Sequence, residues 1–278
     1  MNTKELFGMK NPWVDVAAMY NSNNMECLYG DNNNYVCLGD KDAIDNYNDN
    51  AKGTPDEIIT KIPAEPWWGN PLKARLVILS LNPGYVPEVN MTLAKLMQAN
   101  EAVRRQLIAY KAKTLRLEAD SFLPLKEDDV AGSPVSCREA VNMLGDWYWV
   151  KTLKHLRKDV EHRNSQIDEE EFYKQVALIE YCGYSSETAK HVLPNSEKGS
   201  ADFLKELIRY ISKKEDVLFL IMRDVTRWEK LLISVDCPPN KWISRKPGSR
   251  SQYVTPGNLK DGESENGNYN ELLKFLSK

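Results

Sequence analysis

The sequence predicts a three-layer α/β/α fold with a central, mainly parallel β-sheet. Three short apolar runs, at residues 74–81, 175–181 and 216–222, have the continuous hydrophobicity of strands buried on both faces of a sheet. Segments with apolar residues at helical spacing lie between them. This alternation is typical of parallel sheets with right-handed crossovers, so we expect the three runs to be adjacent parallel strands with helices on both faces.

The chain divides into an extension and one domain. Residues 1–60 are rich in Asn, Asp and Gly, a composition that favours turns and opposes long helices or strands, so we expect an irregular extension packed on the domain. Residues 61–278 form the α/β domain. Its first part, residues 63–71, combines three prolines with two tryptophans, which indicates an ordered loop.

Helices are expected between and after the strands. After the first strand, the spacing of apolar residues predicts helical segments over 91–117 and 137–162. A helix over 201–213 separates the second and third strands, and a short one over 226–233 follows the third. The chain then passes through a basic, turn-rich segment to a last helix from about Asn270.

Composition excludes several classes of protein. With 42% hydrophobic and 28% charged residues, the chain is typical of an ordinary globular domain. Its longest apolar run, residues 217–222, is far shorter than a membrane span, and the N-terminus lacks the apolar stretch of a signal peptide, so we expect a cytoplasmic protein. A net charge of −3 means that any nucleic-acid binding would depend on local basic clusters.

The sequence gives no sign of a metal or cofactor. The five cysteines are scattered without a Cys-x-x-Cys pair, which indicates free thiols. Neither a phosphate-binding glycine loop nor a serine nucleophile elbow is present. We therefore expect no metal and no cofactor.

The most informative motif is Ser-Leu-Asn-Pro-Gly-Tyr at residues 80–85, where the first strand ends. A turn through Pro83 and Gly84 exposes the Asn82 amide and nearby backbone N–H groups at a strand end, where α/β folds bind ligands. Such groups can hold a water, a phosphate or a base edge. The same tripeptide also occurs in plain turns.

This segment resembles the first motif of the uracil-DNA glycosylase superfamily, particularly its mismatch-specific and thymine-DNA branches. The resemblance implies a uracil-DNA glycosylase-like fold, a DNA partner, base flipping, and a DNA-repair hydrolase that cleaves an N-glycosidic bond. By the same resemblance, Asn82 holds the attacking water, and Pro83, Gly84 and Tyr85 line the base pocket, with Tyr85 as its wall or gate.

A second resemblance lies at the end of the second strand, where the superfamily keeps a residue that recognises the base. It implies that Glu180, Tyr184 and Ser185 line the base pocket, although an ordinary loop explains these residues equally well. A carboxylate at Glu180 would prefer the amino group of cytosine or adenine and would repel the oxygens of uracil.

A third resemblance concerns the loop at residues 249–259, which follows the third strand where the superfamily keeps its phosphate-binding loop. Neighbouring Lys241, Arg245 and Lys246 would add charge-assisted contacts, and the alternative is a solvated basic loop. The residues that this resemblance assigns to DNA phosphates are Arg250, Ser251, Thr255, Pro256, Gly257 and Asn258.

Two departures from the superfamily keep other functions open. Its classical members place a histidine in the phosphate loop, whereas His155, His162 and His191 lie elsewhere, and Asn82 replaces the aspartate of the fastest branch. An amide cannot act as a general base. The alternatives are a non-catalytic module that binds nucleic acid or nucleotides, and an enzyme that hydrolyses a free nucleoside or nucleotide.

Two further features have competing interpretations. The tryptophans can stack on bases, but such positions are more often part of a core. The basic stretch at residues 151–163 can track a DNA backbone, and charges at this density are also typical of a solvated helix face.

Overall fold

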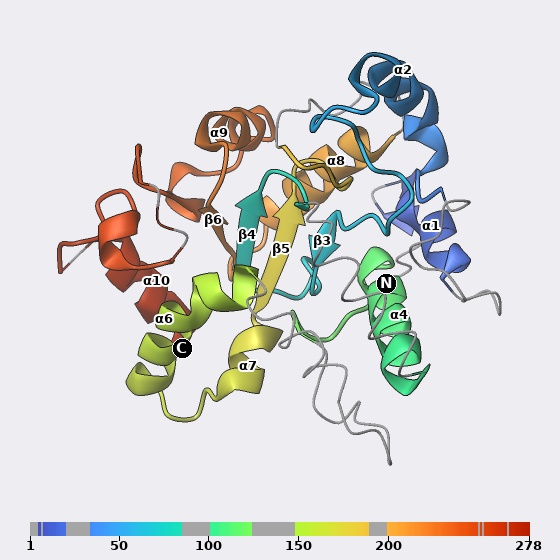
Figure 1. Cartoon of the computed structure of the whole chain (residues 1–278). Coiled ribbons are helices and arrows are strands. Elements are labelled where there is room, and N and C mark those ends of the chain that lie inside the picture. Colours follow the sequence, from blue (N-terminus) through green and yellow to red (C-terminus); the bar gives the residue numbers. More distant parts are fainter. Residues whose placement is uncertain are drawn as a thin grey trace.

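The computed structural model of the chain is built around a five-stranded sheet (Figure 1). It describes residues 5–6, 8–20, 34–84, 101–123, 148–188, 199–249, 251, 253–265 and 267–278. In sheet order, the strands are β3 (Trp67–Trp68), β5 (Val176–Glu180), β4 (Leu76–Ser80), β6 (Leu218–Ile221) and β7 (Trp242–Ser244).

The sheet is parallel except at one edge. β5, β4, β6 and β7 run parallel, and β3 pairs antiparallel with β5. The three predicted strands are therefore adjacent and parallel, as expected. Every residue of β4, β5 and β6 is buried, which explains their unbroken apolar sequences. The sequence predicted neither β3 nor β7.

Helices cover the sheet, and the arrangement is consistent with three α/β/α layers. α6 packs against α7 and α10, and α8 packs against α9. The helices after β4 are α4 (Glu101–Leu115), α6 (Tyr148–Arg163), α7 (Glu169–Lys174), α8 (Ser200–Ser212), α9 (Val225–Ser234) and α10 (Asn268–Leu276). Short 3₁₀ turns are η1 (Leu38–Asp40), η3 (Pro239–Lys241) and η4 (Pro256–Asn258).

Most helical expectations are confirmed where the chain is described. α4 and α6 occupy the described parts of the segments predicted over 91–117 and 137–162, while residues 91–100 and 137–147 lie outside the described part. α8, α9 and α10 form within two residues of the predicted limits. α7 begins after Asp168, whose side chain accepts from the Glu171 backbone N–H at 2.9 Å as an N-cap.

The expectation of an irregular N-terminal extension is wrong for much of its described part. β1 (Glu5–Leu6) pairs with β2 (Met9–Lys10), and two helices follow, α1 (Trp13–Met19) and α2 (Lys41–Ala51). α2 forms despite its Asn and Asp residues because tertiary contacts hold it. Ile44 is fully buried, and the Asn48 side chain both donates to and accepts from the backbone of Ile58 at 2.9 Å.

The described tryptophans expected to be core residues are buried: Trp67, Trp68, Trp149 and Trp228. The described cysteines are free and buried, namely Cys37, Cys182 and Cys237. Burial raises the pKa of Cys182 to about 12 and that of Cys237 to about 11, so these thiols stay protonated at neutral pH. None of the described helices combines the length and the apolar character needed to cross a membrane.

Candidate functional site

The four parallel strands end at one edge of the sheet, which we call the carboxyl edge. β5, β4, β6 and β7 end at Glu180, Ser80, Ile221 and Ser244, and polar side chains such as Asn82, Arg223 and Arg245 lie at or just beyond these ends. Open α/β sheets bind ligands in this position, beyond the carboxyl ends of their strands. The carboxyl edge is therefore the place to look for a site.

Asn82 lies at this edge, directly beyond β4. Its side chain is only 5% exposed, and its amide nitrogen donates to the Pro83 carbonyl at 3.0 Å and to Ser186 Oγ at 3.2 Å. A carbonyl can only accept, so the nitrogen must face Pro83 and the Asn82 Oδ1 atom faces elsewhere. Gly84 also pairs with Ser186 in an isolated parallel bridge. The segment after β4 is thus joined to the segment after β5.

Gly84 is exposed and is not required by the backbone of the turn. Its φ is not in the left-handed region, and no described atom lies within 4 Å of a Cβ built on it. Gly69 shows the opposite case, because its φ is +69° and a Cβ there would lie 2.8 Å from the Val176 carbonyl oxygen. An alanine at position 84, two residues beyond Asn82, would therefore meet no described atom within 4 Å.

Glu180 ends β5 as a buried acid. Burial raises its pKa to about 8, while a hydrogen bond with Ser80 and the charge of Arg223 lower the pKa by less. Its Oε2 atom has no hydrogen-bond partner among the described residues. Glu180 was expected to act as a carboxylate, but burial favours its neutral acid form at pH 7.

Tyr184 is buried against the N-terminal part of the chain. Its hydroxyl donates to Asp40 Oδ2 at 2.8 Å, and its ring centroid lies 5.2 Å from that of Trp13. Ser185 is also buried and pairs with Ile59 in an isolated antiparallel bridge. The described contacts of both residues are therefore structural, and Ser186, two positions beyond Tyr184, is the residue that bonds to Asn82.

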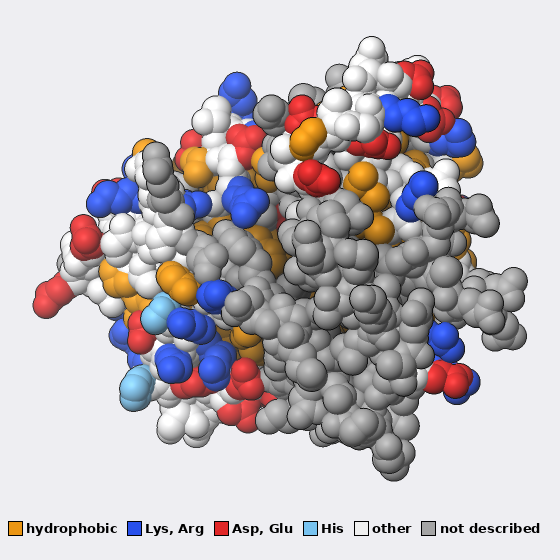
Figure 2. Space-filling view, viewed as in Figure 1, with side chains coloured by type: hydrophobic (Ala, Val, Ile, Leu, Met, Phe, Trp, Pro, Cys, Tyr) orange, Lys and Arg blue, Asp and Glu red, His pale blue; other side chains and the backbone are white. Residues whose placement is uncertain are grey.

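An open pocket of about 540 Å³ lies at the ends of β6 and β7. It contains four cationic side chains beside the first turn of α9 and two acidic ones, Asp224 and Glu229. Figure 2 shows Lys and Arg side chains on the side of the molecule that carries α9 and the segments after β7. The four cationic residues that line the pocket are Arg223, Arg245, Lys246 and Lys260.

The predicted phosphate loop supports this pocket more than it lines it. Ser249 is in the described lining, whereas Ser251, Thr255, Pro256, Gly257 and Asn258 are not. Asn258 accepts from the Lys246 backbone N–H at 2.8 Å and from Ser249 Oγ at 2.9 Å. Residues 244–249, at the end of β7 and just beyond it, line the pocket together with Lys260, and the predicted loop holds residues 246 and 249 in place. Tyr85 and Arg250 lie outside the described residues.

Arg223 connects the pocket to the buried acid. It lines the pocket, and its charge also lowers the pKa of Glu180. Trp228 of α9 donates from Nε1 to the Ser80 carbonyl at 2.6 Å, which fixes the start of α9 next to the end of β4. The carboxyl edge therefore combines a buried polar part, at Asn82 and Glu180, with an open basic part.

Sequence reasoning missed Arg223, Ser80 and Lys260. Arg223 follows a buried strand within two residues, which is the same signal that singled out Asn82. Lys260 carries no such signal, because it reaches the pocket through a backbone bond from its N–H to the Ser244 carbonyl at 3.0 Å. Within the described residues, no group of three or more His, Cys, Asp or Glu side chains is arranged to hold a metal ion.

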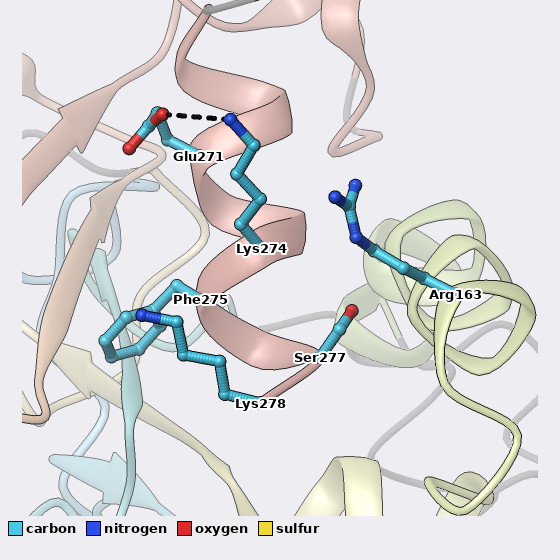
Figure 3. A pocket seen from close by; sticks show the side chains of 6 residues that line it. All are labelled: Arg163, Glu271, Lys274, Phe275, Ser277 and Lys278. Carbon is cyan, nitrogen blue, oxygen red and sulfur yellow. Dashed lines mark ion pairs between the residues drawn. The ribbon is translucent and has the colours of Figure 1, made fainter.

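A second hollow, of about 440 Å³, lies away from the carboxyl edge, between α6 and α10 (Figure 3). Arg163 extends over it from the end of α6, while Lys274 and Lys278 come from the C-terminal segment. Lys274 pairs with Glu271 at 3.6 Å. This hollow is basic but contains no residue of the predicted site.

Compared with protein-family models, with curated proteins and with solved structures, the chain matches none of them.

Proposed function

We propose that the carboxyl edge binds one nucleotide unit of DNA and hydrolyses its N-glycosidic bond, on a uracil-DNA glycosylase-like scaffold. The base lies in the buried part of the edge and the neighbouring phosphates lie in the basic pocket. The observation that carries the proposal is that Asn82 follows β4 and Glu180 ends the neighbouring strand β5, while Arg223 both lines the basic pocket and lowers the pKa of Glu180.

Asn82 holds the attacking water through Oδ1, because its amide nitrogen is engaged by Pro83 and Ser186. The water oxygen bonds to the anomeric carbon and gives up a proton to solvent. The glycosidic bond breaks, and its electron pair leaves with the base nitrogen, which is then protonated. Since an amide cannot accept the water's proton as a general base, the contribution of Asn82 is to position the water.

Glu180 recognises the base as a neutral acid. In this form it offers one O–H donor and one carbonyl acceptor, whereas a carboxylate offers acceptors only. It can therefore pair with a base edge that presents an acceptor beside a donor, as both uracil and cytosine do. The neutral form also removes the repulsion between a carboxylate and the oxygens of uracil.

The basic pocket binds the phosphates beside the flipped base. Arg245 is anchored by a bond to the Ser249 carbonyl, so its guanidinium is held in place before a ligand arrives. Lys246 and Lys260 are exposed and supply contacts that depend on salt concentration.

One observation favours a second candidate, a non-catalytic module that binds nucleic acid or nucleotides. Described histidines His155 and His162 lie on α6 instead of at the carboxyl edge, and His191 is outside the described residues. Without a histidine there among the described residues, stabilisation of the departing base is assigned to Glu180. A protein that keeps the pocket but loses this stabilisation would bind without cleaving.

Mass spectrometry of released bases tests the proposal. The protein is incubated with oligonucleotides that carry uracil, modified pyrimidines or modified purines at one position, and Asn82→Ala serves as the matched control. We expect release of at least one base by the parent protein and loss of that release in the variant. Binding without release would indicate the non-catalytic module, and absence of both binding and release would overturn both candidates.

A further inference from the structure

The solvent-facing side of α6 carries lysines and histidines at helical spacing. Lys151, Lys154, His155, Lys158 and His162 recur every three or four residues, which places them on one side of the helix. At 1.5 Å per residue, this line of side chains is about 16 Å long. The opposite side is buried, through Trp149, Leu153, Leu156 and Val160.

The acidic residues of α6 lie at the margins of this line, and each has a partner. Asp159 accepts from the Tyr269 hydroxyl of α10 at 2.6 Å, and Glu161 pairs with Arg157, which also lies 3.9 Å from Glu169 of α7. Contacts with neighbouring helices thus keep Asp159 and Glu161 at the margins of the exposed side of α6. The middle of the exposed side carries Lys and His alone, on a chain whose net charge is −3.

Lys154 is held in position by an aromatic ring. Its Nζ lies 5.3 Å from the centroid of the Tyr253 ring, and the His155 ring meets the same ring edge-on at 5.1 Å. Tyr253 itself accepts at its carbonyl from Asn258 Nδ2 at 3.1 Å, and Asn258 is the residue that supports the basic pocket. The charged side of α6 is therefore joined to the wall of the pocket.

Figure 2 shows Lys, Arg and His side chains gathered over α6, on the same side of the molecule as those near α9 and the segments after β7. Where α6 ends, Arg163 extends over the hollow in Figure 3, which Lys278 also lines. Positive side chains are thus present at the basic pocket, along α6 and at this hollow.

We propose that the lysines in this line of side chains on α6 form a second contact surface for the sugar–phosphate backbone. This surface binds the strand flanking the nucleotide held at the carboxyl edge. The inference rests on the nucleic-acid partner of the proposed function, which it extends from one nucleotide to a stretch of strand. Lysines spaced along a helix suit a backbone because each releases a counterion from a phosphate without reading a base.

The test is a salt titration of oligonucleotide affinity with Lys154→Gln/Lys158→Gln, using single-stranded and duplex probes of one sequence. Glutamine keeps helix propensity close to that of lysine, so the helix should be retained. The matched control is Lys52→Gln/Lys213→Gln, at exposed positions after α2 and α8. Circular dichroism of both variants checks that folding is unchanged.

We expect the α6 variant to weaken binding and to reduce the slope of log affinity against log salt by about 1 per lysine, or about 2 in all. The probe, single-stranded or duplex, whose binding weakens more in the α6 variant is the form that α6 prefers. A slope equal to that of the control would overturn this inference and leave the proposed function standing. Equal competition by an acidic peptide of the same charge would also overturn it. Lysine-dependent binding without base release would refute the proposed hydrolysis alone.

Discussion

The Asn82 amide donates to the Ser186 hydroxyl at 3.2 Å across the ends of two parallel strands. This bond orients the Asn82 carboxamide, so Oδ1 is presented as an acceptor. Asn82→Ala should lower single-turnover base release by about a hundred- to a thousandfold, which corresponds to ~2.7–4 kcal/mol, because a positioned polar group is lost from the site.

Affinity for DNA should change little in Asn82→Ala, since the phosphate contacts lie in the basic pocket. Ser186→Ala is the companion variant, because it removes the partner and keeps the amide. We expect a smaller loss of rate from it, through poorer orientation of Asn82. Parent-like release by Asn82→Ala would show that this residue does not hold the water.

Glu180 should make stability depend on pH. Its pKa rises from 4.5 to about 8 on folding, so the folded state binds the proton more tightly than the unfolded state. The contribution of Glu180 to the free energy of unfolding is then complete below about pH 4.5 and is lost as pH rises through about 8. Glu180→Gln removes this loss, so the variant should be more stable than the parent protein at pH 9, by on the order of a few kcal/mol.

Urea denaturation of both proteins between pH 5 and 9 measures this difference. Within the proposed function, binding of the base should also weaken above pH 8 in the parent protein and stay constant in Glu180→Gln. Parallel stability curves for the two proteins would contradict a neutral Glu180.

Gly84 and Gly69 give a matched pair of substitutions. Gly84→Ala should change the free energy of unfolding by less than about 0.5 kcal/mol, because no described atom opposes the added methyl group. Base release should nevertheless fall, by up to on the order of a hundredfold, if a ligand occupies that space. Gly69→Ala should destabilise the fold by at least about 1–3 kcal/mol, since its φ is left-handed and the Val176 carbonyl is close. Parent-like release by Gly84→Ala would mean that the space beside Asn82 holds no ligand.

Tyr184→Phe should destabilise the fold without removing a site residue. The hydroxyl bonds to buried Asp40, and loss of a partner for a buried acceptor costs about 1–3 kcal/mol. Tyr47→Phe is the control, because that hydroxyl makes a longer bond of 3.3 Å at a half-buried position. A lower urea midpoint for Tyr184→Phe than for Tyr47→Phe, with the same slope of unfolding free energy against urea concentration, would agree with this expectation. Equal midpoints for the two variants would contradict it.

The strands that could be predicted are those whose burial gives them a continuous apolar sequence. β4, β5 and β6 are buried on both faces, so their apolar runs stand out. β7 has three residues in a basic segment and is defined by its pairing with Phe219–Ile221, which local sequence does not record. Because β7 was not predicted, Arg245 and Lys246 were expected only to assist the loop at residues 249–259, whereas they line the pocket directly after β7.

The site was predictable in part, for a similar reason. Asn82 and Glu180 could be identified because each follows or ends a buried run. Tyr184 could not be placed, since its partners Asp40 and Trp13 are 144 and 171 residues away in sequence and belong to a segment whose composition suggested irregular structure. The protonation state of Glu180 likewise depends on burial by distant residues, which no local pattern contains.

The bonds from Cys37 and Asp40 to Tyr184 and Ser200 have a consequence for biosynthesis. The backbone N–H of Cys37 and its partner, the Tyr184 hydroxyl, are 147 residues apart, which at ~5–20 residues per second takes roughly 7 to 30 s of translation. During that time Cys37 and Asp40 lack the partners that the later part of the chain provides. A nascent chain that ends before about residue 200 lacks the groups that these residues bond to. We therefore expect chaperones to bind the chain most strongly at this stage of synthesis.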